Sequence, residues 1–182
     1  MLIKRKILKR SAGEVGTTLT LFHGSPYSNV DVSEAPLLYY TANIEIARDY
    51  ALGTVAFTGK PPKGVRTEHG PTVYTVKAAG LHIFDFRRTD HQELYQHLRE
   101  DFNKRLTEDE NDSRLPRLDS PGFISHRTGL PRFGIMGTLI PLIKKHHCDA
   151  IWVDEGSRGT SLAIFNPSKV QLQDRVQLKR ST

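Results

Sequence analysis

The hydrophobic pattern near both ends of the chain is typical of β-strands. Residues 19–25 and 37–41 are short runs rich in β-forming side chains, and the first alternates in part between apolar and polar positions. Pro26 ends the first strand, because proline cannot donate to a sheet ladder. Similar patterns predict six further strands: Val55–Thr58, Val73–Val76, Leu81–Phe86, Asp149–Val153, Ser161–Phe165 and Val170–Gln173.

The first of three expected helices follows the second strand. Asn43 can cap its N-terminus, and the helix then runs to about Leu52, where Gly53 supplies the stop. Side chains three or four residues apart share one face of a helix. The stripe expected to face the protein interior consists of Ile46, Ala47 and Tyr50.

A second helix is expected from Asp90, which has the spacing of a capping box with Glu93. Its apolar positions recur every four residues, at Leu94, Leu98, Phe102 and Leu106. The segment 119–133 is broken by proline and glycine and is expected to be irregular. A third helix is expected over 134–147, despite Pro141.

This order of elements favours an α+β fold. Strands dominate both ends of the chain and helices are inserted between them, whereas a doubly wound parallel sheet needs regular alternation. A length of 182 residues suits one domain with a sizeable core. We therefore expect a basic N-terminal arm at 1–16 and a single domain at 17–182.

The positive charge of the protein is concentrated in that arm. The net charge is +6, and residues 1–10 contribute five lysines and arginines without an acid, so the remaining chain has 21 bases against 20 acids. A nearly neutral body argues against a basic groove for nucleic acid. Binding of nucleic acid through the arm alone stays open as an alternative, and it predicts strongly salt-dependent binding that is lost when residues 1–10 are deleted.

Composition also bears on location and metal binding. The arm lacks the continuous apolar region of a secretory signal, and no stretch approaches the roughly 18 apolar residues of a membrane span. Cys148 is the only cysteine, which excludes an intrachain disulfide and a cysteine-cluster metal site. We expect a cytoplasmic protein, in its own or a host cell, with no membrane span and no metal.

The first candidate site motif is Leu-Phe-His-Gly-Ser at residues 21–25. Alternation along a strand points His23 and Ser25 to the same side. Gly24 between them leaves its backbone N–H and C=O open to close approach, so that a ligand amide could pair with them. The alternative is a histidine that ends the core face of the strand and is satisfied by a neighbour.

The second motif joins the strand at 37–41 to the helix that follows it. Tyr39 and Thr41 share one strand face, and Tyr50 lies on the helix. Two tyrosines brought together in this way can sandwich a flat aromatic ring, and such stacking contributes about 0.5–1.5 kcal/mol per pair. The alternative is a pair of core aromatic residues.

Together these motifs resemble the NAD site of ADP-ribosyltransferases of the diphtheria toxin and poly(ADP-ribose) polymerase branch, the His-Tyr-Glu type. That resemblance implies a split β-sheet sandwich with inserted helices, and NAD bound as co-substrate. In the family the histidine contacts a ribose, the glycine backbone holds the nicotinamide amide, and the two tyrosines stack on the nicotinamide ring. The resemblance implies that the NAD pocket of this protein is lined by His23, Gly24, Ser25, Tyr39, Thr41 and Tyr50.

The closing strand departs from the family pattern. Active relatives begin this strand with a glutamate, whereas this chain has Ser161 there. The glutamate accepts a hydrogen bond from the ribose, and its charge favours the cation that develops as nicotinamide leaves. Serine can supply the hydrogen bond but not the charge. Glu155, just before the turn into this strand, could substitute; the alternative is a solvated turn residue. We expect the catalytic residues to be His23, Tyr39 and either Ser161 or Glu155.

The resemblance implies a mono-ADP-ribosyltransferase that modifies a macromolecular acceptor, a protein in preference to a nucleic acid. It also implies a toxin, an effector or a phage-encoded modifier of host machinery. Two alternatives stay open because of the missing glutamate. One is a module that binds NAD or ADP-ribose without chemistry, and the other is an NAD glycohydrolase, in which water is the acceptor.

Overall fold

The computed structural model describes residues 17–26, 30–53, 70–108 and 123–179. The expected arm at 1–16 and the expected strand at Val55–Thr58 lie outside these residues. The described part contains three α-helices and seven strands in two sheets, which is a mixed architecture consistent with the expected α+β class.

The chain divides into two compact units. We call Gly16–Gly80 with Ser161–Thr182 the β1 unit, and Leu81–Thr160 the β5 unit. That the two units together form the single expected domain stays a prediction.

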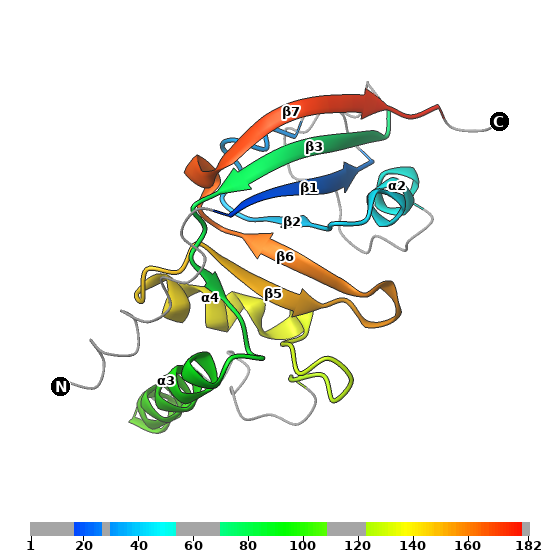
Figure 1. Ribbon diagram of the computed structural model, residues 1–182. Helices are drawn as coiled ribbons and strands as arrows, with labels where there is room; N and C mark the ends of the chain where they lie inside the picture. The colour runs from blue at the N-terminus through cyan, green and yellow to red at the C-terminus, as the bar shows by residue number, and fades with distance from the viewer. Residues whose placement is uncertain (1–16, 27–29, 54–69, 109–122, 180–182) are drawn as a thin grey trace. The chain divides into compact units, whose positions relative to one another are not determined.

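The β1 unit is built on an antiparallel sheet with the strand order β1-β3-β7 (Figure 1). Its strands are β1 (Thr18–Ser25), β3 (Thr72–Ala79) and β7 (Val170–Gln177). The sequence predicted that β3 would end at Val76. The strand continues to Ala79 because its last residues pair with β1 on one side and, as far as Ala78, with β7 on the other.

Strand β7 contains a β-bulge at Gln173. Val76 pairs with Leu172 and Thr75 pairs with Asp174, so Gln173 is an extra residue without a partner on β3. Beyond the bulge the side-chain alternation of β7 shifts by one residue relative to its N-terminal part. Each residue after the bulge therefore lies on the opposite face from the one that simple alternation would give.

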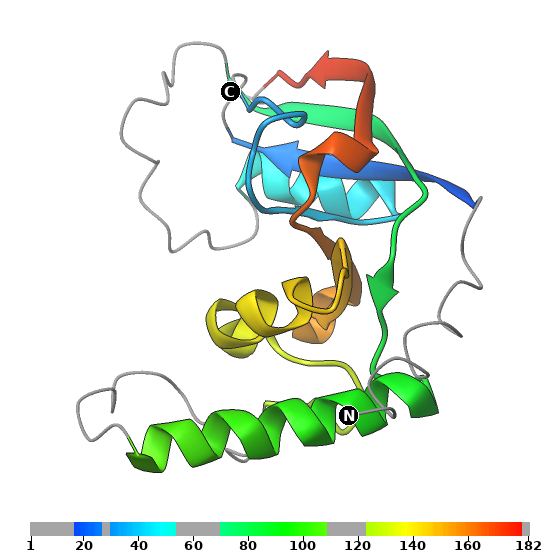
Figure 2. The same cartoon turned by 90° about the vertical axis from the view of Figure 1, so that its left-hand side faces the viewer.

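Helix α2 (Ile44–Leu52) packs on one face of this sheet (Figures 1 and 2). The side chain of Asn43 accepts a hydrogen bond from the N–H of Glu45 at 2.9 Å, and Gly53 ends the helix in a left-handed conformation, as predicted. The buried stripe differs from the expected one. Ala47 and Ala51 are fully buried against β1 and β3, whereas Ile46 and Tyr50 flank them and are half-buried.

Strand β2 (Leu38–Tyr40) pairs antiparallel with β6 (Thr160–Ile164), from Tyr40–Leu162 to Leu38–Ile164. A single bridge joins β2 to β1: Phe22 and Thr41 exchange two backbone hydrogen bonds of 2.8 and 2.9 Å. This bridge is the only one between β1 and β2 in the described residues.

The β5 unit contains a parallel strand pair and two helices. Its elements are β4 (Ile83–Phe84), α3 (Thr89–Glu108), α4 (Met136–Lys144) and β5 (Ala150–Asp154). Leu94 and Leu98 of α3 are buried, as their spacing predicted. The expected capping box is wrong. The helix begins one residue before Asp90, whose carboxylate instead accepts hydrogen bonds from Arg88.

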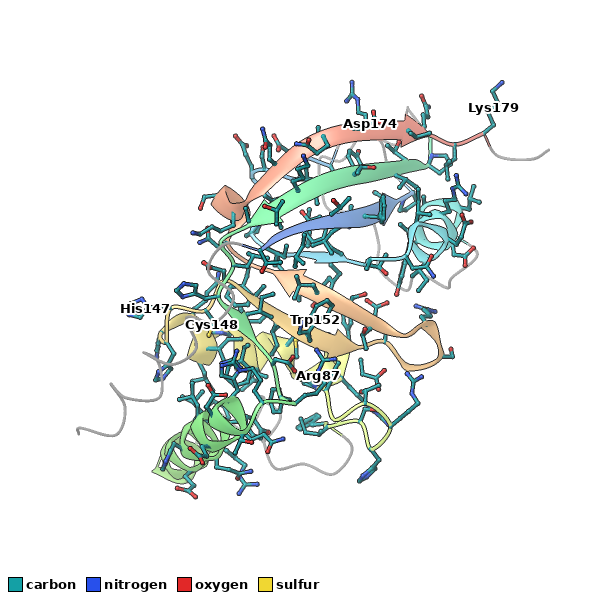
Figure 3. The ribbon with its side chains drawn as sticks, viewed as in Figure 1. Arg87, His147, Cys148, Trp152, Asp174 and Lys179 are labelled. Atoms are coloured by element: carbon teal, nitrogen blue, oxygen red, sulfur yellow. The ribbon has the colours of Figure 1, made fainter. Side chains whose placement is uncertain are left out.

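Aromatic and basic side chains of this unit pack in pairs. The ring of His91 stacks on Phe84 with a centroid distance of 4.9 Å, and its Nδ1 accepts the backbone N–H of Asp85. The Arg87 guanidinium lies 5.8 Å from the centroid of the Trp152 ring on β5 (Figure 3). Asp85 holds that guanidinium by two hydrogen bonds of 2.7 and 2.8 Å.

Candidate functional site

The backbone of β1 has an open edge at Gly24. Because Phe22 directs its N–H and C=O toward β2, the peptide groups of Gly24, two residues later, point to the same edge. The pairing of β1 with β2 ends before Gly24, and no described residue pairs with Gly24 at this edge. An extended backbone therefore presents one donor and one acceptor side by side, as the motif predicted.

His23 explains why the ladder stops. Its Nδ1 lies 2.9 Å from the carbonyl oxygen of Tyr39, and because a carbonyl only accepts, Nδ1 carries the proton. In a continued antiparallel ladder that carbonyl would face the amide of Gly24. The imidazole of His23 thus donates to the Tyr39 carbonyl in place of the backbone N–H of Gly24. The N–H of Gly24 therefore has no partner on β2 among the described residues.

The protonation state of His23 follows from its surroundings. Burial lowers the pKa of the ring, and this effect exceeds that of the hydrogen bond to Tyr39, which raises it. The ring is therefore neutral near pH 7, with Nδ1 as a donor and Nε2 as an acceptor. No described residue uses Nε2. A neutral acceptor of this kind suits a ligand hydroxyl.

Gly24 has a second role that the sequence did not reveal. A Cβ at this position would lie 1.7 Å from the carbonyl oxygen of Ala47 and 3.0 Å from the backbone nitrogen of Ala51. Helix α2 thus packs directly on the backbone of β1, and only glycine allows that approach. The same contact fixes the position of Tyr50, which lies on the flank of this helix.

The two tyrosines of β2 face opposite sides. Tyr39 shares its side with Thr41, as predicted, and the register with β6 places Ser161 opposite Thr41, one step beyond the last pair. Thr41 and Ser161 are buried, with exposed fractions of 5% and 3%. The hydroxyl of Thr41 accepts the N–H of Asn43 at 3.1 Å and so shapes the entry to α2.

Two aromatic residues beside His23 were missed by sequence reasoning. The ring of Tyr40 lies 5.7 Å from that of His23 between centroids, and the ring of Tyr74 lies 6.1 Å away. Tyr74 is directly opposite His23 on β3. Ser25 is buried and opposite Thr72. A strand register between segments about fifty residues apart would have been needed to find Tyr74.

Glu155 belongs to the β5 unit, where it is half-buried at the start of the turn that leads into β6. Its N–H donates to the carbonyl of Gly159 at 3.0 Å, which closes the turn. Its expected catalytic role stays a prediction, as do the assigned roles of the other site residues.

The loop at 125–131 is anchored on the buried carboxylate of Asp154. Arg127 donates to Asp154 at 3.0 Å and to the carbonyl of Gly156, and the N–H of Gly156 donates to Asp154 at 2.9 Å. Burial raises the pKa of Asp154, but the hydrogen bonds from Ser125, Gly156 and their neighbours together hold it below its usual value.

The described residues contain no group of three metal-ligating side chains. Burial raises the pKa of Cys148 to about 12, which keeps its thiol protonated and unreactive. None of the helices in the described part of the chain is long and apolar enough to cross a membrane.

No protein-family model and no curated protein matches the sequence. Among solved structures, the chain is similar to a chain in the crystal structure of the M. tuberculosis MbcT–MbcA toxin–antitoxin complex. The sequence identity is 11%, the TM-score is 0.45, and the similarity covers 94% of this chain and 91% of the other. The resemblance to ADP-ribosyltransferases thus depends on the motif residues themselves and stays a prediction.

Proposed function

We propose that the protein is an NAD-dependent mono-ADP-ribosyltransferase that modifies a macromolecular acceptor. The observation that carries this proposal is the open peptide edge of Gly24 beside a neutral His23. A carboxamide has one N–H donor and one carbonyl acceptor side by side. It can therefore pair with Gly24 as a neighbouring strand would, and nicotinamide is such a carboxamide.

The remaining groups fit the rest of a nicotinamide nucleoside. Nε2 of His23 accepts a hydrogen bond from a ribose hydroxyl. Tyr39 shares its strand face with Thr41 and Ser161, and Tyr50 extends from the helix that packs on Gly24. Tyrosine rings at these positions are suited to stack on the nicotinamide ring.

In the proposed reaction, the glycosidic bond between the ribose and the nicotinamide nitrogen breaks, and nicotinamide leaves with the bonding electrons. A nucleophilic group of the acceptor forms the new bond to the ribose carbon and gives its proton to solvent. Ser161 donates or accepts a hydrogen bond at the ribose but supplies no negative charge to the cationic transition state. We therefore expect slow turnover and a single addition per site.

The decisive measurement is release of nicotinamide from NAD by the purified protein, with and without cell lysate. Release that requires lysate, with radiolabel from NAD entering a protein, supports the transferase. Release without labelled protein supports the glycohydrolase instead. Stabilisation by NAD without any release supports the non-catalytic module, and absence of NAD binding overturns the whole proposal.

Four variants locate the site, each with a matched control. His23→Ala and Tyr50→Ala should abolish NAD binding or turnover while the protein stays folded. His91→Ala and Tyr95→Ala alter buried rings of the β5 unit and should leave NAD binding unchanged.

Ser161→Ala and Glu155→Ala decide which residue occupies the third catalytic position. Their controls are Thr138→Ala, which removes another buried hydroxyl, and Glu93→Ala, which removes an exposed carboxylate. If neither His23→Ala nor Tyr50→Ala affects NAD, the site assignment is wrong.

A further inference from the structure

One side of strand β5 is only partly covered. Side chains alternate along the strand, and Ile151 and Val153 point to a fully buried side. Trp152 points to the other side and is half-buried, and Asp154 shares that side. A parallel bridge pairs Asp154 with Arg132, and residues paired in a bridge point to the same side. Trp152 and Arg132 therefore lie on one face of the β5 unit.

Two further arginines on this face are held by carboxylates. Arg87 lies 5.8 Å from the centroid of the Trp152 ring (Figure 3), and Asp85 holds its guanidinium by two hydrogen bonds. Arg127 donates to the buried carboxylate of Asp154 at 3.0 Å. Both arginine side chains stay half exposed, at 53% and 58%. Because their positions are already fixed, contact with a partner would cost little side-chain entropy.

Arg132 is different, because its charge is not paired. Its backbone N–H donates to the carbonyl of Phe123 at 2.7 Å, which fixes the main chain. The residue is exposed, and its guanidinium makes no hydrogen bond or ion pair with the described residues. The next residue, Phe133, adds apolar surface that is 51% exposed. We call the surface formed by Trp152, Arg87, Arg127 and Arg132 the Trp152 face.

The charges of the Trp152 face favour a protein over a nucleic acid. A nucleic acid needs several cations to neutralise its phosphates, whereas carboxylates of the protein already neutralise Arg87 and Arg127. The one unpaired guanidinium suits a single carboxylate of a partner. Tryptophan and arginine are also the side chains that most often dominate the energy of protein–protein interfaces. The complementary surface is therefore an acidic protein segment with apolar side chains.

We propose that the Trp152 face docks an acidic segment of the acceptor protein, with a carboxylate on Arg132 and an apolar side chain against Trp152. This inference rests on the proposed function, because that function requires a macromolecular acceptor. It gives the β5 unit a binding role beyond the expected role of Glu155.

The test uses the fluorescence of Trp152, which is the only tryptophan of the chain. Poly-L-glutamate added to the full chain should shift the emission of Trp152 and protect it from quenching by acrylamide. Arg132→Gln should weaken this binding about two- to fivefold, the range for an exposed ion pair, and Arg132→Lys should weaken it less. Lys145→Gln removes an exposed cation just beyond α4 and should change nothing. The control matters because poly-L-glutamate can also bind the basic residues at 1–10.

The outcomes separate this inference from the proposed function. Unchanged emission of Trp152, or equal binding to the wild type and Arg132→Gln, overturns the inference even if the protein releases nicotinamide from NAD. Stronger protection by single-stranded poly(U) RNA than by poly-L-glutamate would assign the surface to nucleic acid and overturn the protein partner. Protection by poly-L-glutamate in a protein that does not bind NAD would refute the proposed function but keep the docking surface.

Labelling in lysate tests whether the docked protein is the acceptor. Less radiolabel from NAD should enter protein with Arg132→Gln than with the wild type, and Lys145→Gln should label as the wild type does. Equal labelling by Arg132→Gln would mean that the acceptor docks elsewhere.

Discussion

Gly24→Ala should destabilise the protein by pushing α2 away from β1. The added methyl carbon would lie 1.7 Å from the carbonyl oxygen and 2.7 Å from the carbonyl carbon of Ala47, far inside van der Waals contact. These are backbone atoms of a helix, so no side-chain rotation relieves the clash. The helix must shift, and the buried contacts of Ala47 and Ala51 with Val73 loosen.

The cost can be bounded from comparable changes. Added methylenes in a packed core cost typically about 1–3 kcal/mol, and a clash with backbone belongs at the upper end. For a chain of this length each kcal/mol lowers Tm by roughly 2–4 °C, so we expect a decrease of about 6–12 °C. Thermal unfolding followed by circular dichroism measures it.

The matched control is Gly137→Ala in α4, where an added Cβ meets nothing within 4 Å. Alanine in a helix interior is favoured over glycine by about 0.5–1 kcal/mol, so this variant should be neutral or slightly more stable. A Gly24→Ala protein whose Tm stays within 1–2 °C of the wild type would refute the packing argument. A displaced helix should also weaken NAD binding, because Tyr50 moves with it.

Three further predictions concern stability. The pKa of His23 is lowered in the folded protein, so protonation favours unfolding, and stability should decrease as pH falls below 6.5, the value of the unfolded chain. His23→Gln should reduce this slope in melts between pH 7 and 5, and an unchanged slope would contradict the argument. Asp154→Asn should cost about 1.5–3 kcal/mol in urea unfolding, because charge-assisted hydrogen bonds are lost. Adding Arg127→Ala to it should cost little more, and full additivity would mean that the two side chains are not coupled. Thr138→Val should raise stability by about 1 kcal/mol, because the buried hydroxyl of Thr138 has no partner in the described residues. A loss of stability there would indicate a hydrogen bond to water.

Local signals in the sequence predicted both ends of α2 correctly. Asn43 and Gly53 cap the two ends of α2 through hydrogen bonds to residues nearby in the sequence. Such local contacts can be recognised from the sequence. The end of β3 could not be predicted from local sequence, because Lys77–Ala79 are held in the strand by pairing with segments far away in the sequence. The capping box at Asp90 failed for a different, local reason, because Arg88 donates two hydrogen bonds to the Asp90 carboxylate.

The sequence indicated which residues could form the site, but not how they are arranged in space. The motif identified His23 and the open peptide of Gly24. It did not reveal that Gly24 also allows α2 to pack on β1, because that role depends on how closely the helix approaches the strand. Nor did it indicate Tyr74, which lies opposite His23 only through the pairing of β1 with β3.

The bulge at Gln173 also bears on how the protein behaves at high concentration. Strand β7 is the outermost strand of its sheet in the described residues, and exposed edge strands serve as templates for aggregation. An unpaired residue interrupts the regular spacing of backbone donors and acceptors along that edge, and Asp174 and Arg175 follow directly after it. A second chain can therefore not add to β7 as a long, regular ladder. Deleting Gln173 would straighten the edge and remove this protection against fibre formation.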